Sequence, residues 1–231
     1  MSSRARLTPE IADIRRALRD AWEGLPDAEP GDLFLLGLSG GADSLALAAA
    51  LAFEAPRAGF LGGAIIVDHG LQEASAEVAT RAADQARKLG LDPVMIVRVE
   101  VGEDGGPEAA ARSARYGAFE QALAETGARR ILLAHTLDDQ AETVLLGLAR
   151  GSGAGSLQGM AKDTGKFFRP ILGIRRAETL KSCADAGLTP WHDPHNSDER
   201  YTRVRVRQQV LPLLESELGP GVAEALARTA E

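Results

Sequence analysis

The hexapeptide Ser-Gly-Gly-Ala-Asp-Ser, residues 39–44, combines the residue types that hold phosphate groups. It follows an apolar run, DLFLLGL (32–38), and precedes an alanine-rich stretch typical of a helix. A glycine pair between a strand and a helix lets backbone N–H groups approach a bound anion, and the helix adds its positive end. The motif therefore predicts a phosphate site made of Ser39, Gly40, Gly41, Asp43 and Ser44.

Two features of this loop narrow its chemistry. No lysine stands where a GxxxxGKS/T loop requires one, which excludes a phosphate loop of the kinase or GTPase type. Asp43 is a carboxylate beside a phosphate, an arrangement that is repulsive unless Mg²⁺ lies between them or a substrate amine pairs with the acid. The alternative is an ordinary glycine turn with Asp43 as a helix cap.

A second charged cluster lies in AHTLDDQAET, residues 134–143. Asp139 and Glu142 are three positions apart, and Asp138 and Glu142 are four apart, so a helix that starts near residue 138 places these carboxylates along one face. Acidic side chains at a helix start beside a phosphate loop suit magnesium or an incoming ammonium group. A capped, solvated helix start is the alternative interpretation.

Arginines form two further groups. Arg112 and Arg115 are three apart on a predicted helix and suit phosphate contacts, although a solvated helix face explains them equally well. RYTRVRVRQQVLP (200–212) is ambiguous. A strand would place Arg203, Arg205 and Arg207 on one face, whereas a helix would group Arg200, Arg203 and Arg207.

The histidines and the cysteine indicate no metal centre. His69 and His135 end predicted strands, where a hydrogen bond to a neighbouring loop is favoured over catalysis. His192 and His195 lack ligand partners at useful spacing. Cys183, the single cysteine, reads as a small buried helix residue, and one cysteine cannot form a disulfide framework, so a reducing cytoplasm fits best.

The order of predicted elements indicates the fold. Short branched apolar segments without clean alternation are typical of parallel strands buried on both faces, and helical stretches alternate with them. This pattern predicts an α/β, Rossmann-like fold: an open parallel five-stranded sheet with helices on both faces, with ligands at the carboxyl ends of the strands. Strands are expected at 32–38, 61–70, 93–101, 129–135 and around FFRPIL (167–172), and helices at 8–25, 44–54, 75–89, 107–126, 138–149 and 175–187.

Beyond the sheet we expect a glycine-rich loop at 150–160 and a mostly helical tail from residue 199, with Pro212 at a break or near a helix start. We divide the chain into an α/β domain with an N-terminal helix, residues 1–173, and a helical, arginine-containing extension, residues 174–231, that completes the site. The net charge of −7 argues against a protein that coats nucleic acid by charge alone, and no apolar run approaches the length of a membrane span.

Several stretches resemble a known family. SGGADS resembles the pyrophosphate-binding loop of the ATP pyrophosphatases, or PP-loop enzymes, whose fold is adenine nucleotide α-hydrolase-like. AHTLDDQAETVLLGLARGSGAGSLQGM (134–160) resembles the signature of the tRNA(Ile)-lysidine synthetase family. Four further pieces agree with that family, and the resemblance runs from about residue 33 to 214; the pieces are VDHGL (67–71), EAAARSARY (108–116), RPIL (169–172) and HDPHNSDERYTRVRVR (192–207).

The resemblance implies a cytoplasmic ligase that forms a carbon–nitrogen bond. ATP would adenylate C2 of the wobble cytidine of a CAU-anticodon tRNA(Ile) with release of pyrophosphate, and L-lysine would displace AMP to give lysidine, which changes decoding from AUG to AUA. The phosphate loop, with Arg112 and Arg115, would bind ATP, and Asp43 would hold Mg²⁺. Asp139, Asp43 and Arg203 would be catalytic.

The resemblance also implies how lysine and tRNA are held. Glu142 would pair with the lysine ammonium, and Asp139 would take its proton or orient it, since an amine with a pKa of about 10.4 must be deprotonated before it attacks. Similarity to the family favours a helix from which Arg203 and Arg207 reach phosphate groups. For tRNA we expect contacts from Arg150, Arg200 and Arg207, with Lys162 nearby, or a homodimer. Val204 and His195 depart from the family pattern, which usually has Asn and Ser there.

Two alternatives compete with this assignment, one of them another enzyme and the other of a different class. A thiolase-type PP-loop enzyme that modifies tRNA should carry CxxC pairs or a catalytic cysteine, and the single cysteine in a predicted helix argues against it. A nucleotide-binding fragment without full activity is the second, and the acidic net charge keeps it open.

Overall fold

The computed structural model describes residues 7–70, 74–102, 106–151, 157–193 and 197–230. His195 and residues 152–156 of the expected glycine-rich loop fall outside these ranges.

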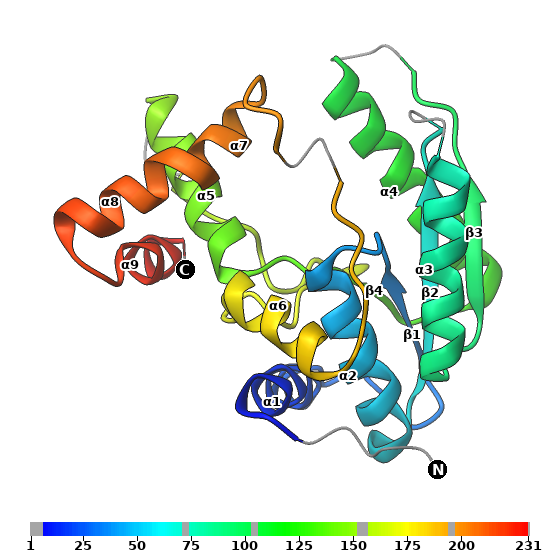
Figure 1. The fold of residues 1–231 in the computed structure, drawn as a ribbon. Helices are drawn as coiled ribbons and strands as arrows, with labels where there is room; N and C mark the ends of the chain where they lie inside the picture. The colour runs from blue at the N-terminus through cyan, green and yellow to red at the C-terminus, as the bar shows by residue number, and fades with distance from the viewer. Residues whose placement is uncertain (1–6, 71–73, 103–105, 152–156, 194–196, 231) are drawn as a thin grey trace.

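The centre of the molecule is the predicted parallel sheet of five strands (Figure 1). All its pairings are parallel, and the strand order is β3-β2-β1-β4-β5. The order reverses between β1 and β4, and in open α/β sheets the ligand site lies at that switch point, at the carboxyl ends of the strands. The strands are β1 Leu33–Gly37, β2 Leu61–Asp68, β3 Val94–Arg98, β4 Arg130–Leu132 and β5 Phe167–Phe168.

Helices cover both faces of the sheet, as expected. Phe34 and Leu36 of β1 point into a large core against α1 (Pro9–Glu23), α2 (Ala42–Ala58) and α3 (Ser75–Leu89). Leu35, the residue between them, packs instead with Phe119 of α4 (Pro107–Thr126) on the other face. Because successive strand residues point to opposite faces and both faces are covered, β1 is apolar throughout and shows no alternation.

The C-terminal part is helical and lies beside α5 (Leu137–Ala149), away from the sheet (Figure 1). It contains α7 (Thr202–Arg205), a π-helical turn (Val206–Val210), α8 (Leu211–Leu218) and α9 (Val222–Thr229). The ambiguous arginine run is therefore helical. Pro212 occupies the first turn of α8, directly after the π-helical turn, so it lies near a helix start as expected. A small apolar cluster joins this part to α5, made of Ala141, Val206, Leu211 and Ala223.

α6 (Arg176–Asp185) packs against α1 and α2, and Arg175, the residue before it, pairs with Glu224 of α9 at 2.5 Å, so this region links the two parts of the molecule. Its start is fixed from α5: the backbone N–H of Arg176 donates to Asp138 Oδ2 at 2.7 Å. No helix in the described ranges is long and apolar enough to cross a membrane.

Candidate active site

The predicted phosphate loop joins β1 to α2. Gly40 has φ +83°, a conformation that side chains with a Cβ rarely adopt, and Gly41 is the N-cap of α2. Ser44 Oγ donates to Gly41 O at 3.0 Å and lies 3.1 Å from Ser39 Oγ. The loop thus presents two hydroxyl groups and the positive end of a 17-residue helix to the same space, which is the arrangement that binds phosphate.

A distant segment holds the loop in place. The backbone N–H of Trp191 donates to Gly40 O at 2.9 Å, and Thr189 exchanges two hydrogen bonds of 3.3 Å with the side chain of Gln85 on α3. In a trans peptide the C=O and the following N–H point in opposite directions. The bond to Trp191 therefore sets the direction of the Gly41 N–H, which faces Ser39 Oγ at 3.4 Å.

Asp139 and Glu142 start α5 directly after β4. Thr136 caps the helix: its backbone N–H and its Oγ1 donate to Asp139 Oδ2 at 2.8 and 2.9 Å. Glu142 lies one turn further on and has no solvent exposure. A buried carboxylate needs charge partners, and the structure supplies them as arginines.

Arg176, at the start of α6, touches both groups of predicted residues and was missed by the sequence analysis. Its guanidinium donates to Asp139 Oδ1 at 2.7 Å and to Glu142 Oε1 at 3.1 Å, and its Nε lies 3.5 Å from Asp43 Oδ2. A cation in the first turn of a helix opposes the helix dipole, and that mismatch in RRAETL was the available signal.

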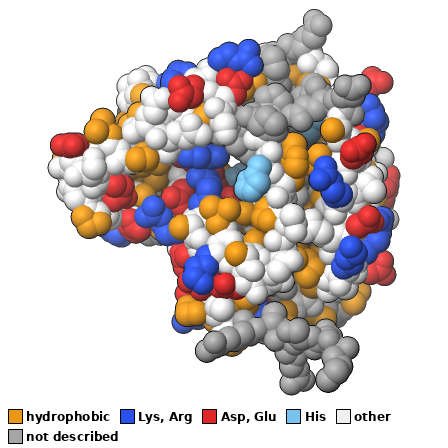
Figure 2. All heavy atoms as spheres, in the orientation of Figure 1, with side chains coloured by type: hydrophobic (Ala, Val, Ile, Leu, Met, Phe, Trp, Pro, Cys, Tyr) orange, Lys and Arg blue, Asp and Glu red, His pale blue; other side chains and the backbone are white. Residues whose placement is uncertain are grey.

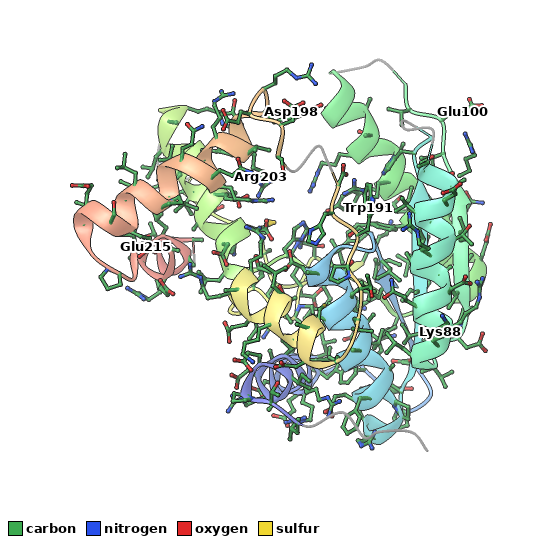
Figure 3. All side chains as sticks on the ribbon, viewed as in Figure 1. Lys88, Glu100, Trp191, Asp198, Arg203 and Glu215 are labelled. Atoms are coloured by element: carbon green, nitrogen blue, oxygen red, sulfur yellow. The ribbon has the colours of Figure 1, made fainter. Side chains whose placement is uncertain are left out.

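Arg203 and Arg207 lie on the helical run that the family similarity favours, but their partners here are these carboxylates rather than the phosphate groups we expected. Figure 3 shows Arg203 on the C-terminal helical part. Arg203 Nε donates to Glu142 Oε2 at 2.8 Å, and Arg207 Nε donates to Glu142 Oε1 at 2.7 Å. Arg207 also lies 3.5 Å from Asp139 Oδ1. Every carboxylate oxygen of Asp139 and Glu142 thus has a hydrogen-bond donor.

The two aspartates of the site have opposite electrostatic surroundings. Burial raises the pKa of Asp43, although hydrogen bonds from Thr179 and the charge of Arg176 act against it. Burial also opposes ionisation of Asp139, but Arg176 and the backbone N–H of Thr136 outweigh it and hold the pKa below its usual value. Asp139 is therefore a firmly ionised group, whereas the charge on Asp43 favours an additional cation.

Arg112, Arg115 and two histidines form the opposite wall. Arg112 stacks on Tyr116 of the same helix, 4.7 Å from the ring centre, and Arg115 Nε donates to His69 Nε2 at 3.4 Å. His135 Nδ1 accepts a hydrogen bond from Arg169 Nε at 3.2 Å, in the loop after β5. Burial lowers the pKa of His135 to about 4, so the ring is neutral at pH 7 and carries its proton on Nε2.

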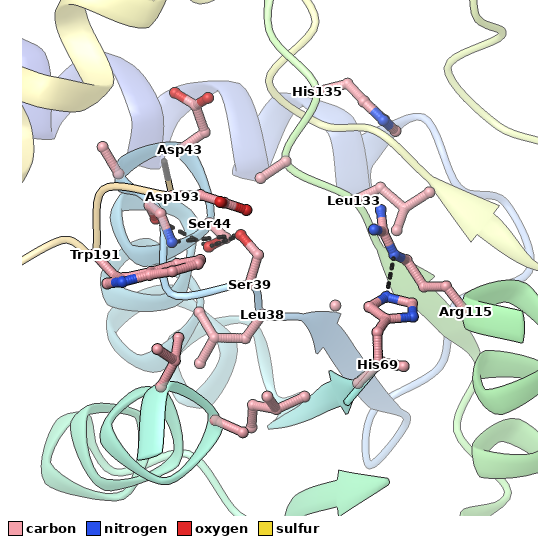
Figure 4. Close-up of a pocket in the computed structure, with 18 of the residues that line it drawn as sticks. Leu38, Ser39, Asp43, Ser44, His69, Arg115, Leu133, His135, Trp191 and Asp193 are labelled. Carbon is pink, nitrogen blue, oxygen red and sulfur yellow. Dashed lines mark hydrogen bonds between the residues drawn. The ribbon is translucent and has the colours of Figure 1, made fainter. Parts of the chain in front are cut away.

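These walls enclose a cleft of about 770 Å³ at the carboxyl ends of the strands (Figure 4). Figure 2 shows a hollow in the centre of this face with basic, acidic and histidine side chains at its edge. The predicted residues that line the cleft are Ser39, Gly41, Asp43, Ser44, Arg112, Arg115, Asp139 and Arg207. Arg150 and Arg200 lie outside it: Arg150 donates to Leu146 O at the end of α5, and Arg200 pairs with Asp198 at 2.6 Å.

The strand order and the glycine loop define a PP-loop domain, and the model of the PP-loop domain family matches residues 13–214. The chain is 73% identical over 202 residues to a tRNA(Ile)-lysidine synthase of Leifsonia xyli, covering 87% of the chain and 61% of that protein. It is 56% identical over 222 residues to the synthase of Thermobifida fusca, covering 96% and 68%. The chain belongs to the tRNA(Ile)-lysidine synthase family.

A solved structure confirms the fold independently. The U34-tRNA thiolase NcsA of Methanococcus maripaludis superimposes with a TM-score of 0.78 at 20% sequence identity, over 96% of this chain and 78% of that one. At this identity the likeness concerns the fold. The chain spans 61% of the length of the Leifsonia relative and 68% of the Thermobifida relative.

Proposed function

We propose that this protein is a cytoplasmic ligase that joins lysine to the wobble cytidine of a CAU-anticodon tRNA(Ile) at the expense of ATP, which becomes AMP and pyrophosphate. The observation that carries the proposal is the placement of Asp139 in one cleft with the SGGADS loop, with Arg176 joining the loop to Asp139 and to the buried Glu142. Family membership supports the choice of substrates.

The phosphate side of the cleft would hold ATP. Ser39, Ser44 and the start of α2 would receive the phosphate oxygens, with Arg112 and Arg115 opposite. In-line positioning and charge neutralisation supply most of the catalysis for a displacement at phosphorus. The wobble base lies in an anticodon loop, where extrusion toward the α-phosphate costs little.

The surroundings of Asp43 fit a magnesium ion. Mg²⁺ is typically bound by one or two carboxylates together with substrate phosphates, and the described residues contain no group of three or more acidic, histidine or cysteine side chains that would cage a metal. Asp43 lines the cleft beside the loop, and its raised pKa reflects a charge that lacks a full counter-ion. Magnesium held there would neutralise charge on the phosphates.

The acidic side of the cleft would take lysine. Asp139, ionised and fixed by Thr136, would orient the ε-amine or accept its proton, and Glu142 would pair with the ammonium form. His135 would offer its Nε2 proton as a neutral donor in the same cleft. The arginine-containing extension from residue 174 would complete the site through Arg203 and Arg207.

For tRNA we propose contacts by the exposed Arg150 and Arg200, at the ends of the helical part, and by Arg207 at the cleft; a homodimer is a second way to extend that surface. A thiolase reaction has no support. Cys183 is buried on α6, where its thiol donates to Ala42 O, and burial with nearby Asp43 raises its pKa to about 12. A thiol so rarely ionised is a poor nucleophile.

The decisive experiment is an AMP-release assay with ATP, L-lysine and a panel of tRNAs. We expect lysine-dependent AMP release only with a tRNA that has a CAU anticodon, together with a lysidine product found by mass spectrometry. AMP release with lysine and no tRNA would instead identify an amino-acid ligase.

Asp139→Asn is the matching variant. It removes the charge that would handle the lysine amine and leaves the phosphate loop intact, so we expect lysidine formation to fall at least about 100-fold, the lower end of a general-base contribution. ATP binding, measured by calorimetry, should change less than about threefold. Lysidine formation at the unmodified rate would overturn the assignment.

A further inference from the structure

The acidic pocket proposed for lysine is already filled by the protein's own cations. Arg176 occupies Asp139 Oδ1 and Glu142 Oε1, while Arg203 and Arg207 occupy the oxygens of Glu142. The remaining oxygen, Asp139 Oδ2, is used by Thr136. An ammonium group entering this pocket must therefore displace a guanidinium, because Glu142 is closed to solvent and offers no other face.

Arg176 is the arginine placed to leave. Its Nε lies 3.5 Å from Asp43 in the phosphate loop, so the same guanidinium borders both halves of the cleft. Its backbone N–H is anchored on Asp138, so the helix start is held by a bond that does not involve the guanidinium. Phosphate oxygens bind a planar guanidinium strongly through paired hydrogen bonds. Nucleotide phosphates on the loop would thus compete with Asp139 and Glu142 for Arg176.

We propose that Arg176 is a positioning residue that fills the ammonium site until nucleotide phosphates draw it away, so that a primary ammonium binds tightly only after the triphosphate. The proposal rests on the function proposed above. The charge balance explains the order: without phosphate, Arg176 and an ammonium compete for the same carboxylate oxygens, and with phosphate each cation has its own anion. Such a device would keep lysine out of the site until the phosphates are in place.

Coupling of this kind is reciprocal and measurable. If the nucleotide raises the affinity for lysine by some factor, lysine raises the affinity for the nucleotide by the same factor. We expect about a tenfold effect, within the usual range of 5- to 150-fold for coupled sites. The ε-ammonium must carry the effect, because it is the group that replaces the guanidinium.

The test is calorimetric titration of the whole chain with L-lysine, with and without the magnesium complex of α,β-methylene-ATP, whose α–β bond cannot be split. We expect lysine to bind about tenfold more tightly with the analogue. Norleucine, which has the same carbon chain without the ε-amine, should show no such gain. Equal lysine affinity in the two titrations would overturn the proposal without any variant being needed.

Arg176→Met tests the residue itself. The variant removes one of the two guanidinium groups at Asp139 Oδ1 and Glu142 Oε1 and leaves Arg207 in place, so lysine should bind without nucleotide, and the coupling should fall to about twofold or less. Arg87→Met, on the exposed face of α3, is the matched control and should keep the full coupling. Full coupling in Arg176→Met would contradict the role. If that variant does not fold, Arg176→Lys, which cannot bridge both carboxylates, should reduce the coupling.

The outcomes separate the two proposals. If lysidine forms on tRNA but nucleotide and lysine bind independently, the proposed role of Arg176 is wrong and the proposed function stands. If nucleotide and lysine binding are coupled through the ε-amine but no lysidine forms on any CAU tRNA, the proposed function is wrong and the role of Arg176 stands.

Discussion

Asp43 and Asp139 carry the same charged group, yet the protein treats them in opposite ways. Asp139 is buried and Asp43 is partly buried at the edge of the cleft, and both lie near Arg176. Asp139 has the stronger set of donors, since Thr136 and Arg176 together satisfy both of its oxygens. At Asp43 the hydrogen bond from Thr179 and the charge of Arg176 do not offset the cost of burial, so its pKa rises, while the pKa of Asp139 falls. Folding alone thus satisfies Asp139, whereas the proposed magnesium ion would complete the surroundings of Asp43.

Neutral variants should therefore shift stability in opposite directions. A raised folded-state pKa means that the folded state binds the proton of Asp43 more tightly than the unfolded chain does, so charge on Asp43 reduces stability as pH rises through that pKa. Asp43→Asn should raise the free energy of unfolding at pH 7. The gain should vanish at acidic pH, where Asp43 is protonated in both states.

For Asp139 the sign reverses. Its lowered pKa contributes stability that is present above the ordinary aspartate value of about 3.9 and is lost as pH falls through the folded-state pKa. Asp139→Asn should cost about 2 kcal/mol at pH 7, the scale of hydrogen bonds to a charged group, and the cost should shrink at low pH. Urea unfolding of both variants at several pH values checks the pair, and shifts of the same sign at pH 7 would contradict it.

The sequence predicted the phosphate loop and the carboxylates of the site, but it did not predict Arg176, the arginine that joins them. The loop residues and Asp138, Asp139 and Glu142 stand in short motifs whose spacing alone brings them together. Arg176 has no such motif. Its place depends on α6 packing against α1 and α2, a contact between segments more than 100 residues apart that no local pattern encodes.

At the scale of elements, replacing glycine by alanine should have opposite effects on stability in a loop with positive φ and in the middle of a helix. Gly40→Ala forces a residue with a Cβ into φ +83° and should cost about 1–2 kcal/mol. It should also weaken pyrophosphate binding, because the Gly40–Gly41 peptide sets the donor direction. Gly117→Ala, in the middle of α4 with open space around it, should instead stabilise the protein by about 0.8–1 kcal/mol. Thermal unfolding and calorimetry with pyrophosphate measure both effects.

Periodicity predicted the helices at 75–89 and 107–126 with the bounds that α3 and α4 have. It placed α2 too short, at 44–54 against Ala42–Ala58, because Pro56 reads as a helix stop. The helix instead runs two residues past Pro56. The arginine run could not be assigned from its pattern, since Val204 and Val206 suit a buried strand face as well as the buried side of α7 and the π-helical turn.

On the scale of the whole molecule, the helices beyond α6 depend on a core of their own. Leu211 is 7% exposed in the cluster with Ala141, Val206 and Ala223, while Leu213 on the same helix is 59% exposed. The large core beside the sheet includes no residue of α8 or α9. Because the smaller cluster buries few side chains, the C-terminal helices should open before the sheet does.

Leu211→Ala should therefore cost about 2–5 kcal/mol in the local stability of α8 and α9, and Leu213→Ala should stay within about 0.5 kcal/mol. Hydrogen exchange followed by mass spectrometry separates the regions. Peptides of α8 and α9 should lose protection in Leu211→Ala while peptides of β1 and β2 keep theirs. Equal loss in the sheet would mean that the molecule opens as one unit.

The bond from Trp191 to Gly40 places a fluorescent side chain beside the phosphate loop. The chain has two tryptophans: Trp22 is 6% exposed and packs on Phe34 and Phe60 in the core, whereas Trp191 lines the cleft beside the phosphate loop. The indole of Trp22 reports on the sheet and its helices, and that of Trp191 on the space above the loop. Intrinsic fluorescence thus carries two separable signals in the unlabelled protein, one from its folded core and one from its ligand site.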